Sequence, residues 1–366
     1  MSKIGIMGGS FDPVHKEHIE LIRLAINQLE LDSFLIIPVA NNPWKEGSVA
    51  TKEQRLDMLK IAISSIDDVA IDTIELDNDT KEKNYTIDTL RVLKNRYSED
   101  SLFYIMGMDQ ASQFDKWKCA KEISQLVQLV AFERLGYKSN ENIEKYHFIK
   151  LHNVATTASS SAIRDGDLTH LDTRVLHYIT NQGIYLESLI APTMSKKRFI
   201  HTKSMATLAR DIAEANGLHG HKAYIAGMFH DIAKEMPKEE ATELMKKYFP
   251  KYINKPFPIW HQWLSAFIAK EKYLVEDVEI LQAIRHHTTA SIHMAPLDMC
   301  IYVADKYDPS RGYDVSKEID LCKKDVLEGF KACLKDFYIF SKKKNRDIDS
   351  YFYEVYSSFV EEKLDE

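Results

Sequence analysis

Residues 3–18 read KIGIMGGSFDPVHKEH, a short apolar run followed by two glycines, a proline and two histidines. The apolar run predicts a buried strand, and the proline stiffens a turn that we expect to lead into a helix. Gly8 and Gly9 let the backbone bend tightly and approach a ligand closely. Because helix N-termini favour anions, and His15 and His18 are spaced to share one helix face, the stretch predicts a phosphate site in an α/β fold.

The same strand-then-helix alternation continues to about residue 190. The runs IGIM, SFLIIPVA, VAIDTIEL, LFYIMG and LVQLVAF are predicted strands, with amphipathic helical patterns between most of them. This order is typical of a doubly wound parallel sheet. Beyond it, long helical patterns such as SMATLARDIAEANGL and VEILQAIRHHT replace the strand signals. We therefore predict an α/β domain over 1–190 and an all-α domain over 191–366.

The composition excludes several classes of protein. Of the 366 residues, 45% are hydrophobic and 28% charged, which is typical of a globular protein. The net charge of −7 disfavours general binding to nucleic acid. The four cysteines form no CxxC pair, so we expect no disulfides. Without a leader-like or membrane-length apolar stretch, we predict a cytoplasmic protein that contacts no membrane, and no motif signals a partner protein.

A second anion site is predicted near the end of the α/β half, in ASSSAIRDG. Here Ser159, Ser160 and Ser161 can cap a short helix that also carries Arg164. The guanidinium of an arginine is a permanent, fork-shaped cation that suits phosphate. Two anion sites in one α/β domain suggest a nucleoside triphosphate as ligand.

Together these motifs carry a family resemblance. GGSFDPVHxxH and SSxxIR resemble the nucleotidyltransferases of the HxGH superfamily, and above all the bacterial nicotinate-nucleotide adenylyltransferases. PWKE, RLDMLKIAI, NYTIDTL, IMGMDQ, FDKWK and YITNQGIY are also similar, so the resemblance spans about residues 1–188. It implies that the phosphate of nicotinate mononucleotide attacks the α-phosphate of ATP, with Mg²⁺ on the triphosphate and pyrophosphate leaving.

The resemblance also implies roles for individual residues. His15, His18, Lys45 and Arg164 would stabilise the charge of the transition state. The nicotinate pocket would be formed by Thr86 and Trp117, with the indole stacked on the pyridine ring. The remaining nucleotide contacts would be Gly8, Gly9, Ser10, Phe11, Asp109, Ser160, Ser161 and Ile163.

The chain departs from this family at two places. Glu17 precedes the second histidine, where the family carries glycine, and its carboxylate should repel a triphosphate unless the side chain points away. PWK, at residues 43–45, replaces the more usual PHK. Both departures concern the surroundings of the triphosphate, so we expect them to affect the rate more than the reaction.

Histidines gather again in the helical half. FHDIAKE places His230 beside Asp231, while His201 and Asp305 lie in the apolar contexts RFIHTKSMATLA and CIYVADKY. An unpaired polar group is costly in an apolar interior, and one metal would satisfy several of them together. These residues therefore predict a metal site.

The order His, His-Asp, Asp resembles the HD phosphohydrolase superfamily, in which His261 and His287 would complete a second metal site. AIRHHTT and ADKYDPSR are similar to motifs of the symmetrical diadenosine tetraphosphate hydrolases, although Asp308 and Ser310 stand in place of Glu and Gly. The resemblance implies cleavage of diadenosine tetraphosphate to two ADP. It also implies phosphate contacts from Lys234 and Arg311, and the metal ligands His201, His230, Asp231, His261, His287 and Asp305.

Imidazole and carboxylate ligands without a thiolate favour two transition metals, with iron preferred over manganese or cobalt, rather than structural zinc. Two alternatives stay open for the helical half. It could hydrolyse another nucleotide, such as a nucleoside monophosphate or a regulatory nucleotide, or act as a metal-containing sensor that regulates the transferase without turnover. For the transferase, a preference for nicotinamide mononucleotide is the alternative to nicotinate.

Overall fold

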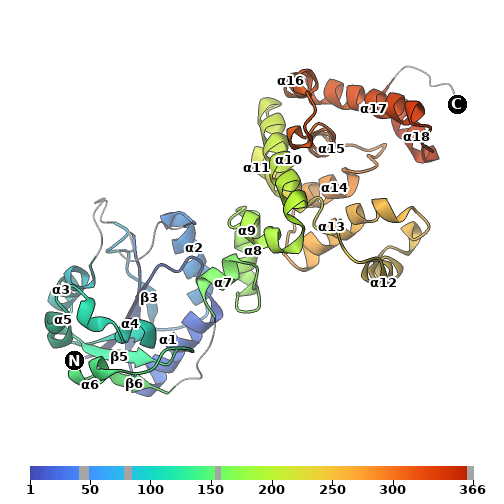
Figure 1. Ribbon diagram of the computed structural model, residues 1–366. Helices are drawn as coiled ribbons and strands as arrows, with labels where there is room; N and C mark the ends of the chain where they lie inside the picture. Colours follow the sequence, from blue (N-terminus) through green and yellow to red (C-terminus); the bar gives the residue numbers. More distant parts are fainter. Residues whose placement is uncertain (41–48, 78–84, 153–157, 361–366) are drawn as a thin grey trace. The chain divides into compact units, whose positions relative to one another are not determined.

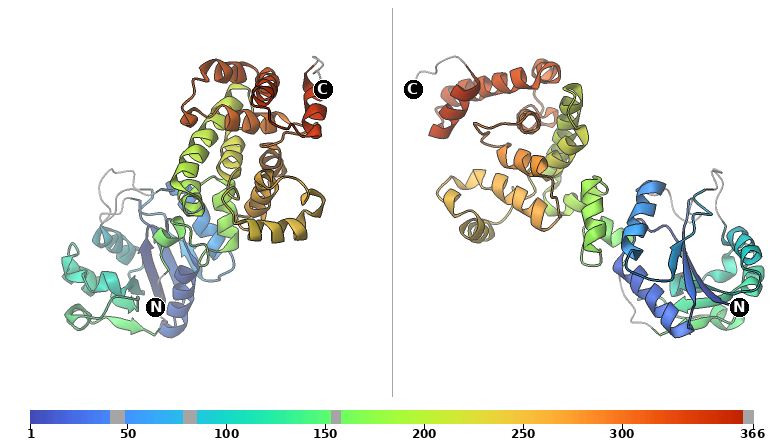
Figure 2. Two further views of the ribbon diagram at one scale, coloured as in Figure 1. Left: turned by 45° about the vertical axis from the view of Figure 1, so that its right-hand side comes forward. Right: turned by 180° about the vertical axis from the view of Figure 1, so that it is seen from behind.

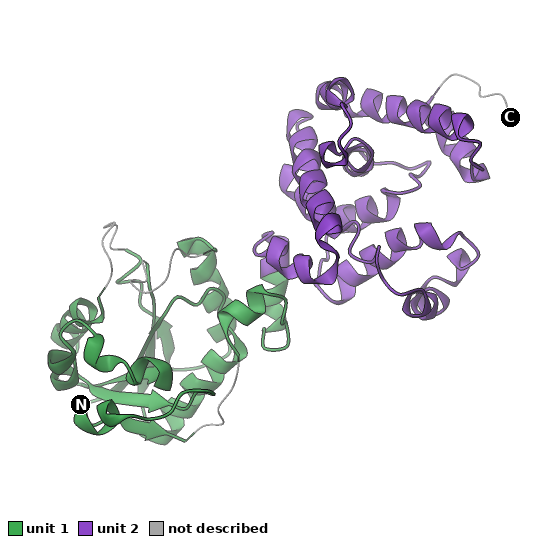
Figure 3. Ribbon diagram, viewed as in Figure 1, with its two compact units in different colours: residues 1–178 green, residues 179–366 purple. Residues whose placement is uncertain are grey.

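The computed structural model describes residues 1–40, 49–77, 85–152 and 158–360, so Lys45 lies outside the described residues. The chain divides into two compact units, Met1–Tyr178 and Ile179–Glu366 (Figure 3). This division falls within helix α8 (Thr173–Asn181). The domain boundary between residues 190 and 191 stays a prediction.

The described part of unit 1 contains a six-stranded sheet in which all pairs are parallel. The strands lie in the order β3-β2-β1-β4-β5-β6. Their bounds are Lys3–Gly9 (β1), Ser33–Pro38 (β2), Val69–Ile71 (β3), Ser101–Gly107 (β4), Gln128–Phe132 (β5) and Ile149–Leu151 (β6). The predicted doubly wound parallel sheet is confirmed. The sequence patterns missed β6, whose three residues are mostly exposed and carry no buried apolar run.

Helices cover both faces of this sheet: α1 and α2 lie on one face, and α3 and α5 lie on the other (Figure 1 and Figure 2). The helices of unit 1 before α8 are α1 (Lys16–Leu29), α2 (Lys52–Ile63), α3 (Thr86–Arg96), α4 (Met108–Ala111), α5 (Ala120–Leu126), α6 (Glu141–Lys145) and α7 (Ser160–Arg164). The strand order reverses between the neighbours β1 and β4, and ligands of such sheets bind at the carboxyl ends of the strands at this point.

Unit 2 is helical throughout its described residues, which confirms the predicted all-α half. Beyond α8, its helices are α9 (Leu186–Ile190), α10 (Lys196–Ala215), α11 (Gly220–Phe229), α12 (Lys238–Tyr248), α13 (His261–Glu271), α14 (Val278–His286), α15 (Pro296–Lys306), α16 (Ser316–Lys324), α17 (Val326–Lys343) and α18 (Ser350–Phe359). Ser195 caps α10, since its side chain accepts the N–H of Arg198.

Close packing of α10 against α11 brings two of the predicted metal ligands together. At Gly227 in α11, a Cβ atom would lie only 2.6 Å from the Cα of Ala206 in α10, so a larger residue would force the helices apart. His201 lies on α10, and His230 directly follows α11. The close approach of the two helices therefore allows their imidazoles to converge.

Within the described part of the chain, no helix is long and apolar enough to span a membrane. The four cysteines, all among the described residues, are free thiols, and three of them are buried. The expectation of no disulfides is consistent with this state.

Candidate active sites

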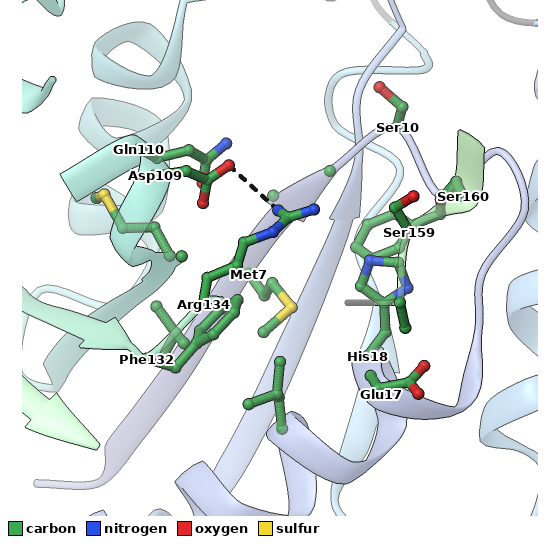
Figure 4. Close-up of a pocket in the computed structure, with 18 of the residues that line it drawn as sticks. Met7, Ser10, Glu17, His18, Asp109, Gln110, Phe132, Arg134, Ser159 and Ser160 are labelled. Atoms are coloured by element: carbon green, nitrogen blue, oxygen red, sulfur yellow. Dashed lines mark hydrogen bonds and ion pairs between the residues drawn. The ribbon is translucent and has the colours of Figure 1, made fainter. Parts of the chain in front are cut away.

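A cavity of about 610 Å³ opens in unit 1 beside the carboxyl ends of β1 and β4 (Figure 4). Its wall combines the turn after β1, the start of α1, the segment from β4 to Trp117, the residues after β5, and the start of α7. The structure brings together these predicted site residues: Gly8, Gly9, Ser10, Phe11, His15, His18, Asp109, Trp117, Ser160, Ser161 and Arg164. The two predicted anion sites thus belong to one cavity.

The start of α1 is fixed by the two histidines themselves. His15 is the N-cap, and its backbone N–H donates to Nδ1 of His18 over 3.2 Å. The two rings stack with their centroids 3.6 Å apart. Burial, together with the positive charges of Arg134 and His170, lowers the pKa of His15 to about 3, so its imidazole is neutral near pH 7. The helix begins at Lys16 because the extended backbone of His15 still belongs to the turn.

The start of α7 is tied to the first turn of the chain. Ser159 is the N-cap and accepts the N–H of Ala162. The Ser160 hydroxyl donates to the carbonyl of Pro13 over 2.8 Å, and the Arg164 guanidinium donates to the carbonyl of Asp12. These long-range bonds hold the two predicted anion-binding segments against each other.

Two predicted site residues do not line this cavity. Thr86 begins α3, where its side chain hydrogen-bonds to that of Tyr104. Ile163 is 1% exposed and packs in the core. Their predicted roles in binding nucleotide stay predictions.

The structure adds polar residues that sequence reasoning missed. Arg134, after β5, forms an ion pair with Asp109, with Nη1 and Oδ2 3.1 Å apart (Figure 4). Lys116, Gln110 and Gln113 line the same cavity. Arg134 could have been suspected, because it lies two residues after a strand whose carboxyl end faces the ligand crevice.

Glu17 does not turn away from the cavity. It lines the wall next to His18, and its side chain is only 10% exposed (Figure 4). Its Oε2 atom lies 3.0 Å from Nδ1 of His15, and its Oε1 atom forms an ion-pair contact with Nδ1 of His170. The carboxylate is therefore held in the wall by two imidazoles.

The second site lies within unit 2, where all six predicted metal ligands converge. Asp231 is the centre of the arrangement. Its Oδ2 atom lies 3.4 Å from Nε2 of His230 and 3.9 Å from Nε2 of His201. Its Oδ1 atom lies 3.3 Å from Nε2 of His261 and 3.7 Å from Nε2 of His287. One carboxylate thus faces two groups of imidazoles, and either group could hold a metal ion with it.

Asp305 adds a second carboxylate to the group formed by His201, His230 and Asp231. Its Oδ1 atom lies 3.2 Å from Nε2 of His201 and 4.0 Å from Nε2 of His230. Burial alone would raise the pKa of this carboxyl, but the charge of Lys306 and the close contact with His201 hold it well below its usual range. The pKa of Asp231 is also well below its usual value, because the neighbouring imidazole of His230 outweighs the opposing effect of burial. Both carboxylates are therefore ionised.

The four imidazoles are anchored through Nδ1, which leaves Nε2 for the centre. The Nδ1 contacts are His201 to Asp308 at 2.7 Å, His230 to the carbonyl of Gly227 at 2.6 Å, His261 to that of Pro258 at 2.9 Å, and His287 to that of Ile284 at 2.6 Å. Such contacts select the tautomer that can ligate a metal through Nε2. Burial lowers the pKa of His261 and of His287, which keeps both rings neutral.

The donor set fits a metal ion. Among the described residues, Nε2 of His201 and Nε2 of His230 are buried and have no hydrogen-bond partner. Leaving polar atoms in this state is costly unless another group satisfies them. Neutral imidazole nitrogens and ionised carboxylates are ligands for divalent transition metals, so a metal would satisfy both atoms.

Cations and hydroxyls surround this ligand set. The predicted phosphate contacts lie beside it: Nζ of Lys234 is 3.3 Å from both ring nitrogens of His261, and Arg311 donates to Asp305 over 2.8 Å. Sequence reasoning missed Arg198, which donates to Asp231 over 2.7 Å, and Thr288. The Thr288 hydroxyl lies 3.0 Å from Nε2 of His261 and 2.9 Å from Nε2 of His287. Arg198 could have been suspected, because it precedes His201 by one helical turn.

Comparison with known proteins places each half in a family. Residues 6–166 match the model described as cytidylyltransferase-like, and residues 198–310 match the HD domain. A protein of Shouchella clausii named probable nicotinate-nucleotide adenylyltransferase is 36% identical over 166 residues, which cover 45% of this chain and 84% of that protein.

A protein of Mycoplasma pneumoniae, named probable nicotinate-nucleotide adenylyltransferase/Ap4A hydrolase, is 29% identical over 93% of this chain and 100% of its own length. A solved structure from Clostridium acetobutylicum, described as a predicted HD superfamily hydrolase involved in NAD metabolism, is 23% identical. The match covers 49% of this chain and 96% of that one, with a TM-score of 0.45. The chain therefore belongs to the nicotinate-nucleotide adenylyltransferase family, and an HD domain follows its nucleotidyltransferase domain in the sequence.

Proposed function

We propose that the chain carries two separate activities. Unit 1 transfers the adenylyl group of ATP to nicotinate mononucleotide, giving nicotinate adenine dinucleotide and pyrophosphate. Unit 2 hydrolyses diadenosine tetraphosphate symmetrically to two ADP. The observation that carries the first activity is the single cavity shared by both anion sites, and the second rests on the carboxylate of Asp231 between two groups of imidazoles.

In the transferase, the residues of the cavity would position the triphosphate and neutralise its charge. Because Nδ1 of His18 accepts the N–H of His15, the proton of a neutral His18 ring is on Nε2, where it can donate to a phosphate oxygen. Arg164 would add a cation from the opposite segment, and Mg²⁺ would accompany the ATP. In-line attack by the phosphate of the mononucleotide then needs positioning and charge neutralisation more than a base. Trp117 would stack on the pyridine ring.

In the hydrolase, His201, His230, Asp231 and Asp305 would hold one metal ion, and His261 and His287 would hold a second with Asp231. Such ions supply Lewis-acid stabilisation of a phosphoryl oxygen and make water more acidic. Iron is the metal that we expect, with manganese or cobalt as substitutes. Lys234, Arg198 and Arg311 would neutralise the tetraphosphate. These cations around the ligand set favour an enzyme over a sensor without turnover.

The hydrolase is tested by incubating the full chain, loaded anaerobically with Fe²⁺, with diadenosine tetraphosphate and separating the nucleotides by chromatography. Two ADP per substrate support the proposal. ATP plus AMP as products, or no product from a protein whose metal content has been measured, would overturn the proposal. The helical half would then hydrolyse another nucleotide or act as a sensor without turnover. Removal of the metal with a chelator should abolish this activity reversibly.

The transferase is tested on the same preparation with ATP, excess Mg²⁺ and either nicotinate or nicotinamide mononucleotide. We expect a clear preference for nicotinate in kcat/KM. Equal or better use of the nicotinamide substrate would overturn that assignment while leaving adenylyl transfer in place.

A further inference from the structure

We propose that Glu17 and His170 are positioning residues of the transferase cavity: Glu17 orients the ring of His15, and His170 offsets the carboxylate charge that would otherwise repel the triphosphate. The inference rests on the proposed adenylyl transfer and adds to it two residues that the family motif does not supply. Neither residue needs to contact a reacting atom.

The first part follows from the contact between Glu17 and His15. Oε2 of Glu17 and Nδ1 of His15 lie 3.0 Å apart. Both atoms are buried, and within the described part of the chain neither has an aligned hydrogen bond. A small rotation of either side chain would let Nδ1–H of His15 donate to the carboxylate. Glu17 therefore favours one tautomer and one orientation of a ring that also stacks on His18.

The second part follows from the way His170 is held. The N–H of Lys16 donates to the carbonyl of His170 over 2.9 Å, and its Nζ donates to the carbonyl of Thr169 over 3.0 Å. These bonds fasten the segment around His170 to the start of α1. The imidazole of His170 is 36% exposed, whereas the carboxylate that it contacts is almost fully buried. His170 can thus accompany Glu17 without itself filling the cavity.

Two other carboxylates of the cavity, those of Asp109 and Asp12, lie against positive or hydrogen-bond-donating groups. Asp109 pairs with Arg134 over 3.1 Å. Asp12 accepts the N–H groups of Val49 and Ala50 and lies 3.8 Å from Arg164. A buried carboxylate beside a triphosphate would otherwise cost binding energy, because both carry negative charge in a poorly solvated site.

For Glu17, the partners that the structure shows are imidazoles, His15 on one side and His170 on the other. The charged groups beside His170 are Lys16, whose ammonium is bonded to the neighbouring carbonyl, and Asp167, which accepts the hydroxyl of Thr169. Loss of His170 should therefore leave the charge of Glu17 facing the phosphate site with only the neutral ring of His15 beside it.

The test is a double-mutant cycle of the full chain: the unmodified protein, His170→Ala, Glu17→Gln and the double variant. Two quantities are measured for each, the KM for ATP and the affinity for inorganic tripolyphosphate by calorimetry. We expect His170→Ala to raise the KM for ATP and weaken tripolyphosphate binding about tenfold, with the KM for the mononucleotide unchanged. Adding Glu17→Gln should restore both values, because the repelling charge is gone.

Asp167→Asn is the matched control, since it removes a carboxylate near His170 that does not line the cavity. It should leave both quantities within twofold of the unmodified protein, and unfolding curves should show that all variants are folded. The charge proposal is overturned if His170→Ala binds tripolyphosphate normally, or if the double variant is no better than His170→Ala.

The orientation of His15 has its own readout. Nitrogen-15 NMR of the imidazole should show its proton on Nδ1 in the unmodified protein and a redistribution to Nε2 in Glu17→Gln, together with a lower kcat. Identical His15 spectra in the two proteins would overturn this part. If the unmodified protein transfers no adenylyl group, the proposed function fails, whereas the tripolyphosphate cycle still decides whether His170 screens Glu17.

Discussion

The two sites arrange similar side chains in different ways. In the metal centre of unit 2, four imidazoles are anchored through Nδ1, and Nε2 of His201 and of His230 is buried without a hydrogen-bond partner. In the cavity of unit 1, the carboxylates of Asp109 and Glu17 already lie against cations or imidazoles, next to about 610 Å³ of open space. Four imidazoles that face one buried carboxylate indicate a resident ion, whereas carboxylates with ion-pair contacts around open space indicate a ligand that enters and leaves.

The largest effect should come from removing the shared carboxylate of the metal centre. Asp231→Asn should lower hydrolysis of diadenosine tetraphosphate by on the order of a thousandfold or more, because both groups of imidazoles lose their common anionic ligand. Adenylyl transfer, measured on the same preparation, should be unchanged. Loss of both activities in a folded variant would contradict the proposal that the two sites act independently.

The reciprocal change in the transferase should be somewhat smaller. His18→Ala should lower adenylyl transfer about a hundred- to a thousandfold, because a donor to the triphosphate is lost, while hydrolysis stays normal. His152→Ala is the matched control, since this exposed histidine does not line the cavity. A His18→Ala variant with normal transfer kinetics would remove the helix start from the proposed mechanism.

The anchoring of His201 through Nδ1 predicts that a residue that contacts this ligand, and not the metal itself, affects metal affinity. Asp308 holds His201, and bonds from His201, Ser204 and Ser310 keep its pKa at about 2 although burial opposes the charge. Asp308→Asn should weaken metal binding about ten- to a hundredfold. Metal titration of the chelated variant measures this, with the exposed Asp314→Asn as control. Equal affinities would mean that the anchor adds nothing.

The smallest effect concerns Glu75, a buried carboxyl that pairs with no cation among the described residues. Its Oε1 accepts the Thr89 hydroxyl, its Oε2 has no partner among the described residues, and burial raises its pKa. Since the folded pKa lies above the unfolded value, ionisation destabilises the fold as pH rises above about 4.3, and the penalty is absent below that pH. Glu75→Gln should therefore stabilise the protein by about 1 kcal/mol at pH 7 and by nothing near pH 3. Urea unfolding at both pH values checks the sign, and a stabilisation that persists at pH 3 would contradict it.

Four of the predicted metal ligands, His201, His230, Asp231 and Asp305, stood out because each is a polar residue in an apolar stretch, whereas His261 and His287 were predicted from the family resemblance. His230 and Asp231 stand out in IAGMFHDIAK, and the structure places them among the least exposed residues of unit 2. Arg198 and Thr288 were missed because an arginine or a threonine at a helix end is common and does not stand out from its neighbours in the sequence. The residues of the cavity were harder to predict from the sequence, because some of them, such as Arg134, lie in loops without a recognisable motif.

The sequence by itself determined the doubly wound sheet and the helical second half, because hydrophobic periodicity and local capping act over a few residues. It also predicted the two segments that line one cavity and the histidines that converge in unit 2. Only the tertiary structure decided which side chains of the chain contact one another. Glu17 meets His170 from the far end of unit 1, and Ser160 meets the carbonyl of Pro13 across 147 residues of chain. Whether a buried charge repels or orients a ligand depends on such distant neighbours, because electrostatic energy in a poorly solvated site follows distance in space and not position along the chain.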